Sequence, residues 1–209
     1  MRVLVGCECS QVVTAAFRAL GHDAFSCDTQ DSYGDLPEYH FKGDLKEVYA
    51  FVNPDLFIAH PPCTFLTHGQ TSRICFSGGS IKDWLRYEKG IYARSFFSWC
   101  LSRPAKMLCI ENPIPSPVFG LPRYSQLVEP WFFGHPYSKS TCLWLRGLPL
   151  LQCTDIVRPL GVWTDLHHSQ RKRSETFSGL AAAMASQWGS GELVGYQYKA
   201  FSQDETNTS

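Results

Sequence analysis

Short apolar runs alternate along the chain with longer stretches in which apolar residues recur every three or four positions. The apolar runs lie at residues 2–6, 23–28, 56–60, 106–112 and 140–147. Runs of this length, bounded by turn-forming residues, are typical of buried β-strands. The pattern therefore predicts a largely buried sheet.

Helical periodicity separates these runs at residues 10–21, 80–102 and 175–189. The first stretch carries the clearest boundaries, because Ser10 stands where a capping residue belongs and Gly21 where a helix ends. Strands that alternate with helices predict an α/β fold, with a mostly parallel sheet and helices on both faces.

The residues that follow the predicted strands are the first candidates for chemistry, because ligands of open parallel sheets bind beyond the carboxyl ends of the strands. These ends carry small, acidic or nucleophilic side chains. They lie in the stretches GCECS (6–10), Asp28, Asp44, HPPC (60–63) and ENP (111–113). Together they predict a functional site at one edge of the sheet.

Cys63 follows two prolines, which end a strand ladder and hold the next turn stiffly. A thiol fixed in this way suits nucleophilic catalysis if its thiolate is stabilised, although inert packing is the ordinary role of such a cysteine. Glu111 lies near the end of the next apolar run. Partial burial there favours a raised pKa of its carboxyl group and proton donation. Capping of a following element is the alternative for Glu111, while Pro113 favours an extended, inward-aimed Asn112.

Composition places the chain among intracellular proteins of one domain. It has 209 residues, no net charge, and no apolar run long enough to span a bilayer. Its nine cysteines are odd in number and several lie inside apolar runs, which predicts free thiols in a reducing, cytoplasmic compartment. No second cysteine pair stands at zinc spacing, so no metal is expected. The zero net charge argues against a large non-specific DNA surface but leaves room for a local basic patch.

PPC (61–63) and ENP (111–113), each after an apolar strand, resemble the nucleophile and glutamate motifs of the cytosine-5 DNA methyltransferases. Asp28 and Asp44 match the acids that follow the second and third strands of that family. VLVGCECS stands at the place of the first cofactor loop, and TFSGLAAAMASQW resembles the final helix motif. The resemblance spans residues 3 to about 188.

This resemblance implies a Rossmann-like fold of the S-adenosylmethionine-dependent methyltransferases. It places a single catalytic domain at residues 1–190 and a polar, partly disordered tail at residues 191–209. The implied reaction transfers a methyl group from S-adenosylmethionine to carbon 5 of cytosine in DNA. Cys63 would add to ring carbon 6, and Glu111 would protonate or hydrogen-bond ring nitrogen 3, with Pro62 and Asn112 completing the two motifs. A base in duplex DNA must be flipped out to reach Cys63.

The resemblance also implies a cofactor site at the ends of the first four strands. Glu8 would meet the positively charged methionine end, and Ser10, at a helix start, would bind its carboxylate. Asp28 would hold the ribose hydroxyls, and Asp44 would face the adenine amino group. The expected set is Gly6, Cys7, Glu8, Ser10, Asp28, Asp44 and His60.

The chain departs from the family in the regions that contact nucleic acid. The glutamine-arginine motif is replaced by residues 137–141, where Lys139 keeps one positive charge. Residues 145–175 form only a short insert in place of a target-recognition domain, as in compact, phage-type relatives. This insert contains three basic residues, Arg171, Lys172 and Arg173. We expect them either to contact phosphates or to form a solvated charged loop. Sequence specificity is then low or supplied by a partner chain.

The glycine-containing segment that follows Cys63 is expected to close over the target base, with Arg73 reaching the phosphate of the flipped nucleotide. A plain surface loop is the alternative. Three functions stay open: methylation of DNA, the same chemistry on RNA or a free cytosine nucleotide, and a non-catalytic nucleic-acid-binding relic of the fold. Retention of Cys63 with Glu111 speaks against the last.

Overall fold

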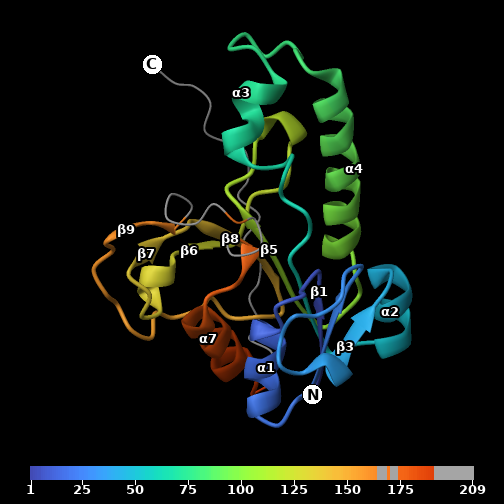
Figure 1. The fold of residues 1–209 in the computed structure, drawn as a ribbon, viewed down its shortest axis with the longest axis vertical. Coiled ribbons are helices and arrows are strands. Elements are labelled where there is room, and N and C mark those ends of the chain that lie inside the picture. The colour runs from blue at the N-terminus through green and yellow to red at the C-terminus, as the bar shows by residue number, and fades with distance from the viewer. Residues whose placement is uncertain (164–168, 170–173, 191–209) are drawn as a thin grey trace, which may run out of the picture.

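A seven-stranded sheet forms the centre of the computed structural model, which describes residues 1–163, 169 and 174–190 (Figure 1). Its strands are β1 (Arg2–Gly6), β2 (Asp23–Asp28), β3 (His40–Lys42), β4 (Leu56–Ala59), β5 (Met107–Pro113), β6 (Gln126–Val128) and β8 (Thr141–Arg146). Their order is β3-β2-β1-β4-β5-β8-β6. The first five strands of this order run parallel to one another, whereas β8 runs antiparallel to both β5 and β6. The expected α/β, Rossmann-like fold with a mostly parallel sheet is confirmed.

Helices cover both faces of the sheet, as the pattern predicted. On one face, α1 (Val12–Ala19) and α7 (Ser178–Trp188) lie side by side, and on the other lie α2 (Leu45–Val52) and α4 (Trp84–Leu101) (Figure 1). Alternate residues of β1 divide between the two layers. Val3 and Val5 pack with α1 and α7, while Leu4 packs with α2 and α4. Successive side chains of a strand point to opposite faces, so one apolar strand contributes side chains to both hydrophobic cores.

Smaller elements complete the described chain. They are the 3₁₀-helices Pro37–Tyr39, His68–Gln70, Pro117–Phe119 and Pro130–Phe132, the short helix α3 (Thr71–Ile74), and the two-stranded parallel sheet of β7 (Tyr137–Ser138) and β9 (Gly161–Val162). Figure 1 shows α3 and the start of α4 extending together beyond the sheet. Within the described residues, no helix has the length and apolarity needed to cross a membrane.

The first helix begins differently from the prediction. Ser10 is not its cap. Gln11 precedes α1 in a left-handed conformation, with φ of 58°, and its side chain makes no capping hydrogen bond. The carboxylate of Glu8 takes that role by accepting from the backbone N–H groups of Val13 at 2.7 Å and Thr14 at 3.2 Å. The predicted stop is confirmed, because Gly21 follows the helix with φ of +80°.

The sequence reading missed a helix between the third and fourth strands. Asp44 caps the start of α2, because its Oδ1 accepts from the Lys46 backbone N–H at 2.7 Å. The strand before it, β3, has only three residues, too few for a periodic signal. Asp44 therefore caps a helix, which is the ordinary role of an acid after a strand.

Gly90 lies in the middle of α4, where helix propensity alone marks it as a weak point. It is buried, and a Cβ at this position would overlap the ring of Phe119. Gly90 is therefore a packing residue that lets α4 approach the segment that follows β5. This contact holds the long helix against the body of the domain.

The strand order reverses between β1 and β4, because the chain leaves β1 toward β2 and returns to β4 on the other side. Such a switch point is where open α/β sheets bind their ligands. The backbone N–H of His60 donates to the carbonyl oxygen of Gly6 at 2.9 Å and so joins the ends of the two strands. The fold thus brings the predicted strand-end residues to one edge.

Candidate active site

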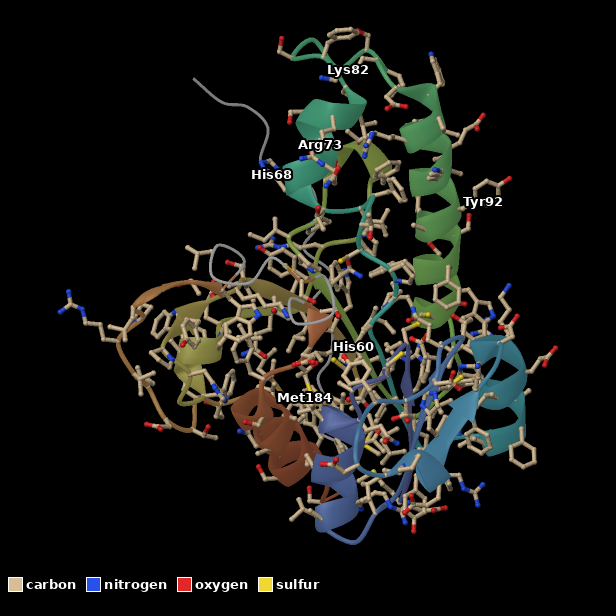
Figure 2. The ribbon with its side chains drawn as sticks, in the orientation of Figure 1. His60, His68, Arg73, Lys82, Tyr92 and Met184 are labelled. Atoms are coloured by element: carbon tan, nitrogen blue, oxygen red, sulfur yellow. The ribbon has the colours of Figure 1, made fainter. Side chains whose placement is uncertain are left out.

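His60 and Glu111 form a close pair at the carboxyl ends of β4 and β5. Their strands pair with Ala59 opposite Ile110, so the two following residues stand level with each other. His60 Nδ1 lies 2.6 Å from Glu111 Oε2, and the two side chains are only 12% and 14% exposed. His60 lies at the centre of the molecule, between the sheet and the extension of α3 and α4 (Figure 2).

The electrostatics of this pair overturn one expectation from the sequence. Burial raises the pKa of Glu111, but the hydrogen bond and charge of His60, with the charge of Lys139, lower it below its ordinary value. Burial lowers the pKa of His60, yet Glu111 and then Glu8 raise it above the ordinary value. The predicted rise in the pKa of Glu111 is therefore wrong. The sequence could not show that a cationic partner would stand beside the carboxylate.

The loop that carries Cys63 is braced from both sides. Asn112, which is buried, donates from Nδ2 to the carbonyl oxygen of Pro61 at 2.8 Å. The backbone N–H of Leu66 donates to the carbonyl oxygen of Cys63 at 2.9 Å and closes a turn. Pro62 is exposed and Cys63 is half-buried. The thiol thus stands partly open on a stiff loop, as a nucleophile requires.

Lys139 lies inside the site rather than on an open surface. Its Nζ donates to the backbone carbonyl of Glu175 at 3.0 Å. Burial lowers the pKa of Lys139, against the opposing charges of Glu111, Cys63 and Glu175. A cavity of about 10 Å³ is lined by Glu111, Lys139 and Phe177, among others. One cation is therefore within electrostatic reach of both predicted catalytic side chains.

The loop after β1 packs tightly into the protein, with Gly6 and Glu8 buried. Thr14 Oγ1 donates to Glu8 Oε2 at 2.6 Å, which adds to the two backbone hydrogen bonds that this carboxylate accepts. Burial raises the pKa of Glu8. Cys7 adopts φ of 60°, and burial raises the pKa of its thiol well above the ordinary value. Gly6 is packed so closely that an added Cβ would meet Leu45 Cδ2 at 2.5 Å.

Asp28 and Asp44 lie together at the ends of β2 and β3. The backbone N–H of Gly43 donates to the Asp28 carbonyl oxygen at 2.9 Å. Asp28 Oδ1 accepts from the Gln30 backbone N–H at 3.0 Å, as Asp44 Oδ1 does from Lys46. In each carboxylate, Oδ2 accepts no hydrogen bond from the described residues. Two carboxylate oxygens are thus available for hydroxyl or amino groups of a ligand.

Ser10 borders a larger cavity of about 440 Å³, a volume in the range of small-molecule sites. The cavity lies between the starts of α1 and α7 and residues 33–36, and Ser178 lines it from α7. Asp28 and Asp44 do not line it, so the predicted cofactor residues fall into two groups. Gly34 packs so closely that a Cβ would meet the Ser10 carbonyl oxygen at 2.5 Å.

The sequence reading missed Gln11, Tyr33–Leu36 and Ser178 as lining residues of this cavity. Ser178 lies within the predicted final helix motif, which is the one signal that pointed to it. Gln11 anchors the loop by donating from Nε2 to the Leu36 carbonyl oxygen at 2.7 Å. No local pattern marked residues 33–36.

The predicted phosphate-binding residues are separated in space. Arg73 is exposed on α3, and Figure 2 shows His68, Arg73 and Lys82 along the α3 side of the extension, while Tyr92 points away from α4. Lys139 belongs to the interior. The remaining candidates, Arg171, Lys172 and Arg173, lie outside the described residues.

Comparisons with known proteins extend only to part of the fold. No protein-family model and no curated protein matches the chain. Among solved structures, it is similar to a protein described as a DNA modification methyltransferase encoded within a prophage of E. coli, with 13% identity, a TM-score of 0.42, and coverage of 69% of this chain and 46% of the other. It is also similar to the Entamoeba histolytica methyltransferase EhMeth, with 14% identity, a TM-score of 0.43, and coverage of 75% and 57%. The chain spans about half the length of these structures.

Proposed function

We propose that this protein is a cytosine-5 DNA methyltransferase that uses S-adenosylmethionine and a covalent cysteine adduct. The observation that supports this function best is the arrangement of Cys63, Glu111 and Lys139 at the ends of β4 and β5. Both predicted catalytic side chains act electrostatically on one buried ammonium group. A nucleophile, an acid–base group and a cation thus face one site.

Each of these residues has a defined part in the reaction. The positive charge of Lys139 favours the thiolate of Cys63. That thiolate forms a bond from Sγ to carbon 6 of cytosine, while Glu111 passes to ring nitrogen 3 the proton that it shares with His60. Carbon 5 becomes nucleophilic and accepts the methyl group. Water takes the carbon-5 proton and ring nitrogen 3 returns its proton to Glu111, which restores the double bond and breaks the bond to Cys63 as a thiolate.

The described residues fit a cofactor of this kind. S-adenosylmethionine supplies an electrophilic methyl group on a sulfonium centre. Ser10 and Ser178 line the 440 Å³ cavity near the starts of α1 and α7, where their hydroxyl groups would bind the carboxylate of the cofactor. Glu8 already binds the first N–H groups of α1, so the start of that helix is not open to a ligand. Asp28 and Asp44 each offer an oxygen that no described residue engages, which suits ribose hydroxyls and an amino group.

DNA is the proposed substrate because of the charge on the segment after Cys63. Residues 64–101 contain five Lys or Arg and two Asp or Glu, although the whole chain is neutral. Arg73 and Lys82 lie along one side of this segment (Figure 2). Phe76 is 59% exposed, and Lys82 Nζ lies 5.8 Å from the centroid of its ring. Cations beside an exposed aromatic ring suit a phosphate backbone and an unstacked base.

Transfer of tritium from methyl-labelled S-adenosylmethionine tests the function. The protein is incubated separately with DNA, RNA and dCMP, and we expect label in DNA that survives removal of free cofactor. Label only in RNA or dCMP would move the same chemistry to another substrate. No label in any of the three would leave the non-catalytic alternative.

The covalent step needs its own assay. An oligonucleotide that contains 5-fluorocytosine should trap an adduct on Cys63, seen as a mass increase of the protein. Cys63→Ala should abolish the adduct and the methyl transfer. Cys153→Ala is the matched control, because Cys153 is an exposed free thiol between β8 and β9, and it should behave as wild type.

A further inference from the structure

We propose that His60 is a positioning residue of this site, which holds the carboxyl group of Glu111 by one oxygen and leaves the other oxygen directed at the bound pyrimidine. The inference rests on the proposed function, and it assigns His60 to the chemistry rather than to the cofactor. It does not concern the motif residues Cys63 and Glu111 themselves.

Geometry is the first support. The His60–Glu111 distance of 2.6 Å is that of a strong, charge-assisted hydrogen bond. It engages only Oε2 of Glu111. The backbones of both residues are fixed, since Glu111 lies within the ladder with β8 opposite Leu143, and the His60 N–H is bound to Gly6. A carboxyl group held at both its backbone and one oxygen has little freedom to turn.

The surrounding charges are the second support. Besides the mutual interaction of His60 and Glu111, two charged groups act on the pair: Glu8 from the first loop and Lys139 from the segment before β8. Burial opposes both charged forms, but the mutual attraction of the pair, with Glu8 acting on His60 and Lys139 on Glu111, favours an imidazolium beside a carboxylate. The proton of the pair therefore resides on His60 in the free protein, close to the group that must serve ring nitrogen 3.

The ring nitrogen on the far side of His60 is the third support. Nε2 is buried and has no hydrogen-bond partner among the described residues. Buried polar atoms of folded proteins are nearly always paired, so an unpaired one beside the predicted acid–base group points to a role other than stabilising the fold. A histidine present only to stabilise the fold would be expected to use both nitrogens, as His40 does with Ser26 and Gln30.

The test combines two variants of His60 with a control. His60→Gln keeps a donor but no charge, and His60→Leu keeps neither. His40→Gln is the control, because His40 is another hydrogen-bonded histidine that lies on β3 away from Glu111. Adduct formation with the 5-fluorocytosine oligonucleotide is followed from pH 5 to 9, together with oligonucleotide affinity.

We expect His60→Leu to slow adduct formation about a hundredfold, His60→Gln to slow it less, and both to keep the affinity within about twofold. The pH profile should lose its dependence on His60 in both variants. Wild-type rates and an unchanged profile in His60→Leu, with wild-type protein active, would overturn the positioning role alone.

Imidazole NMR separates this inference from the proposed function. In the wild type, the His60 resonances should titrate above the ordinary histidine range, and Glu111→Gln should move that titration downward. An unmoved titration in Glu111→Gln would refute the pair in solution. If the titration moves but the wild-type protein forms no adduct, the proposed function and the positioning role both fail, and the pair is a structural one.

Discussion

Asn112 Nδ2 donates to the carbonyl oxygen of Pro61 at 2.8 Å and thereby ties the loop of Cys63 to the strand of Glu111. The two residues are separated by 51 positions in the chain, and the hydrogen bond between them is buried. It joins the two halves of the proposed catalytic pair at the backbone. This amide side chain therefore adds to the pairing of β4 with β5 in holding the Cys63 loop against the strand of Glu111.

Replacement of Asn112 by Ala should misplace the Cys63 loop. We expect adduct formation with 5-fluorocytosine DNA to slow about tenfold to a hundredfold, because small displacements of a nucleophile are costly in rate. The unsatisfied carbonyl should also lower the free energy of unfolding by about 1–3 kcal/mol. Urea unfolding and adduct kinetics measure the two effects. Gln126→Ala removes comparable hydrogen bonds to Leu151 away from the site and should change only stability.

Lys139 should control the reactivity of Cys63. Lys139→Met removes the buried cation, so the alkylation of Cys63 by iodoacetamide near pH 7 should slow by about tenfold. Peptide mass spectrometry follows the alkylation rate at Cys63 against pH. Lys139→Arg keeps the charge and should stay close to wild type. Equal rates in Lys139→Met and wild type would show that the ammonium does not stabilise the thiolate.

The pH dependence of the His60–Glu111 interaction follows from the directions of the two shifts. The raised pKa of His60 means that its stabilisation is complete below the unfolded value of 6.5 and is lost as pH rises through the folded value. The lowered pKa of Glu111 means that its stabilisation is present above 4.5 and is lost as pH falls through the folded value. The interaction is therefore strongest between about pH 4.5 and pH 6.5, the unfolded pKa values of Glu111 and His60.

A double-mutant cycle of His60→Gln and Glu111→Gln measures this interaction by urea unfolding. At pH 5.5 we expect a coupling free energy of about 1–3 kcal/mol, as for other contacting buried pairs. At pH 9 it should be smaller. A coupling that grows toward pH 9 would contradict the assignment of an imidazolium to His60.

Gly90→Ala tests whether packing overrides helix propensity in α4. Ala favours a helix by about 1 kcal/mol over Gly, but its methyl group would overlap the ring of Phe119. We expect a net destabilisation of about 1–3 kcal/mol in thermal or urea unfolding. The double variant Gly90→Ala/Phe119→Leu has a smaller side chain at residue 119 and should recover part of the lost stability. Gly43→Ala is the control, since nothing lies within 4 Å of its added Cβ.

The basic side of the α3–α4 extension should contribute to the salt dependence of DNA binding. For Arg73→Ala/Lys82→Ala, we expect the slope of log K against log salt to fall by about 0.9 for each phosphate that the variant no longer neutralises. Fluorescence anisotropy with a labelled duplex measures it. Lys42→Ala removes an exposed lysine that lies in the edge strand β3 and pairs with Asp31, and it should leave the slope unchanged. An identical slope in the double variant would remove this surface from the proposed interface.

The local pattern of the chain determined the strands and the main helices. Apolar runs at residues 2–6, 23–28 and 56–60 became β1, β2 and β4 with little change, because a strand that is buried on both faces is apolar throughout. The pattern did not reveal β3, β6 or α2. These elements are short, and neighbouring strands and a capping acid at Asp44 stabilise them rather than a periodicity of their own.

The chemistry divides in a similar way. The sequence by itself determined which side chains stand at strand ends, since Cys63 and Glu111 follow apolar runs, and parallel strands bring their carboxyl ends to one edge. Only the tertiary structure decided their partners, because His60, Glu111 and Lys139 come from separate segments of the chain. Those partners reverse the expected shift of the Glu111 pKa. In the same way, tertiary structure directs the carboxylate of Glu8 to the backbone N–H groups at the start of α1. Residue type and strand position are local properties, whereas burial and the nearest charge are set by contacts between distant segments.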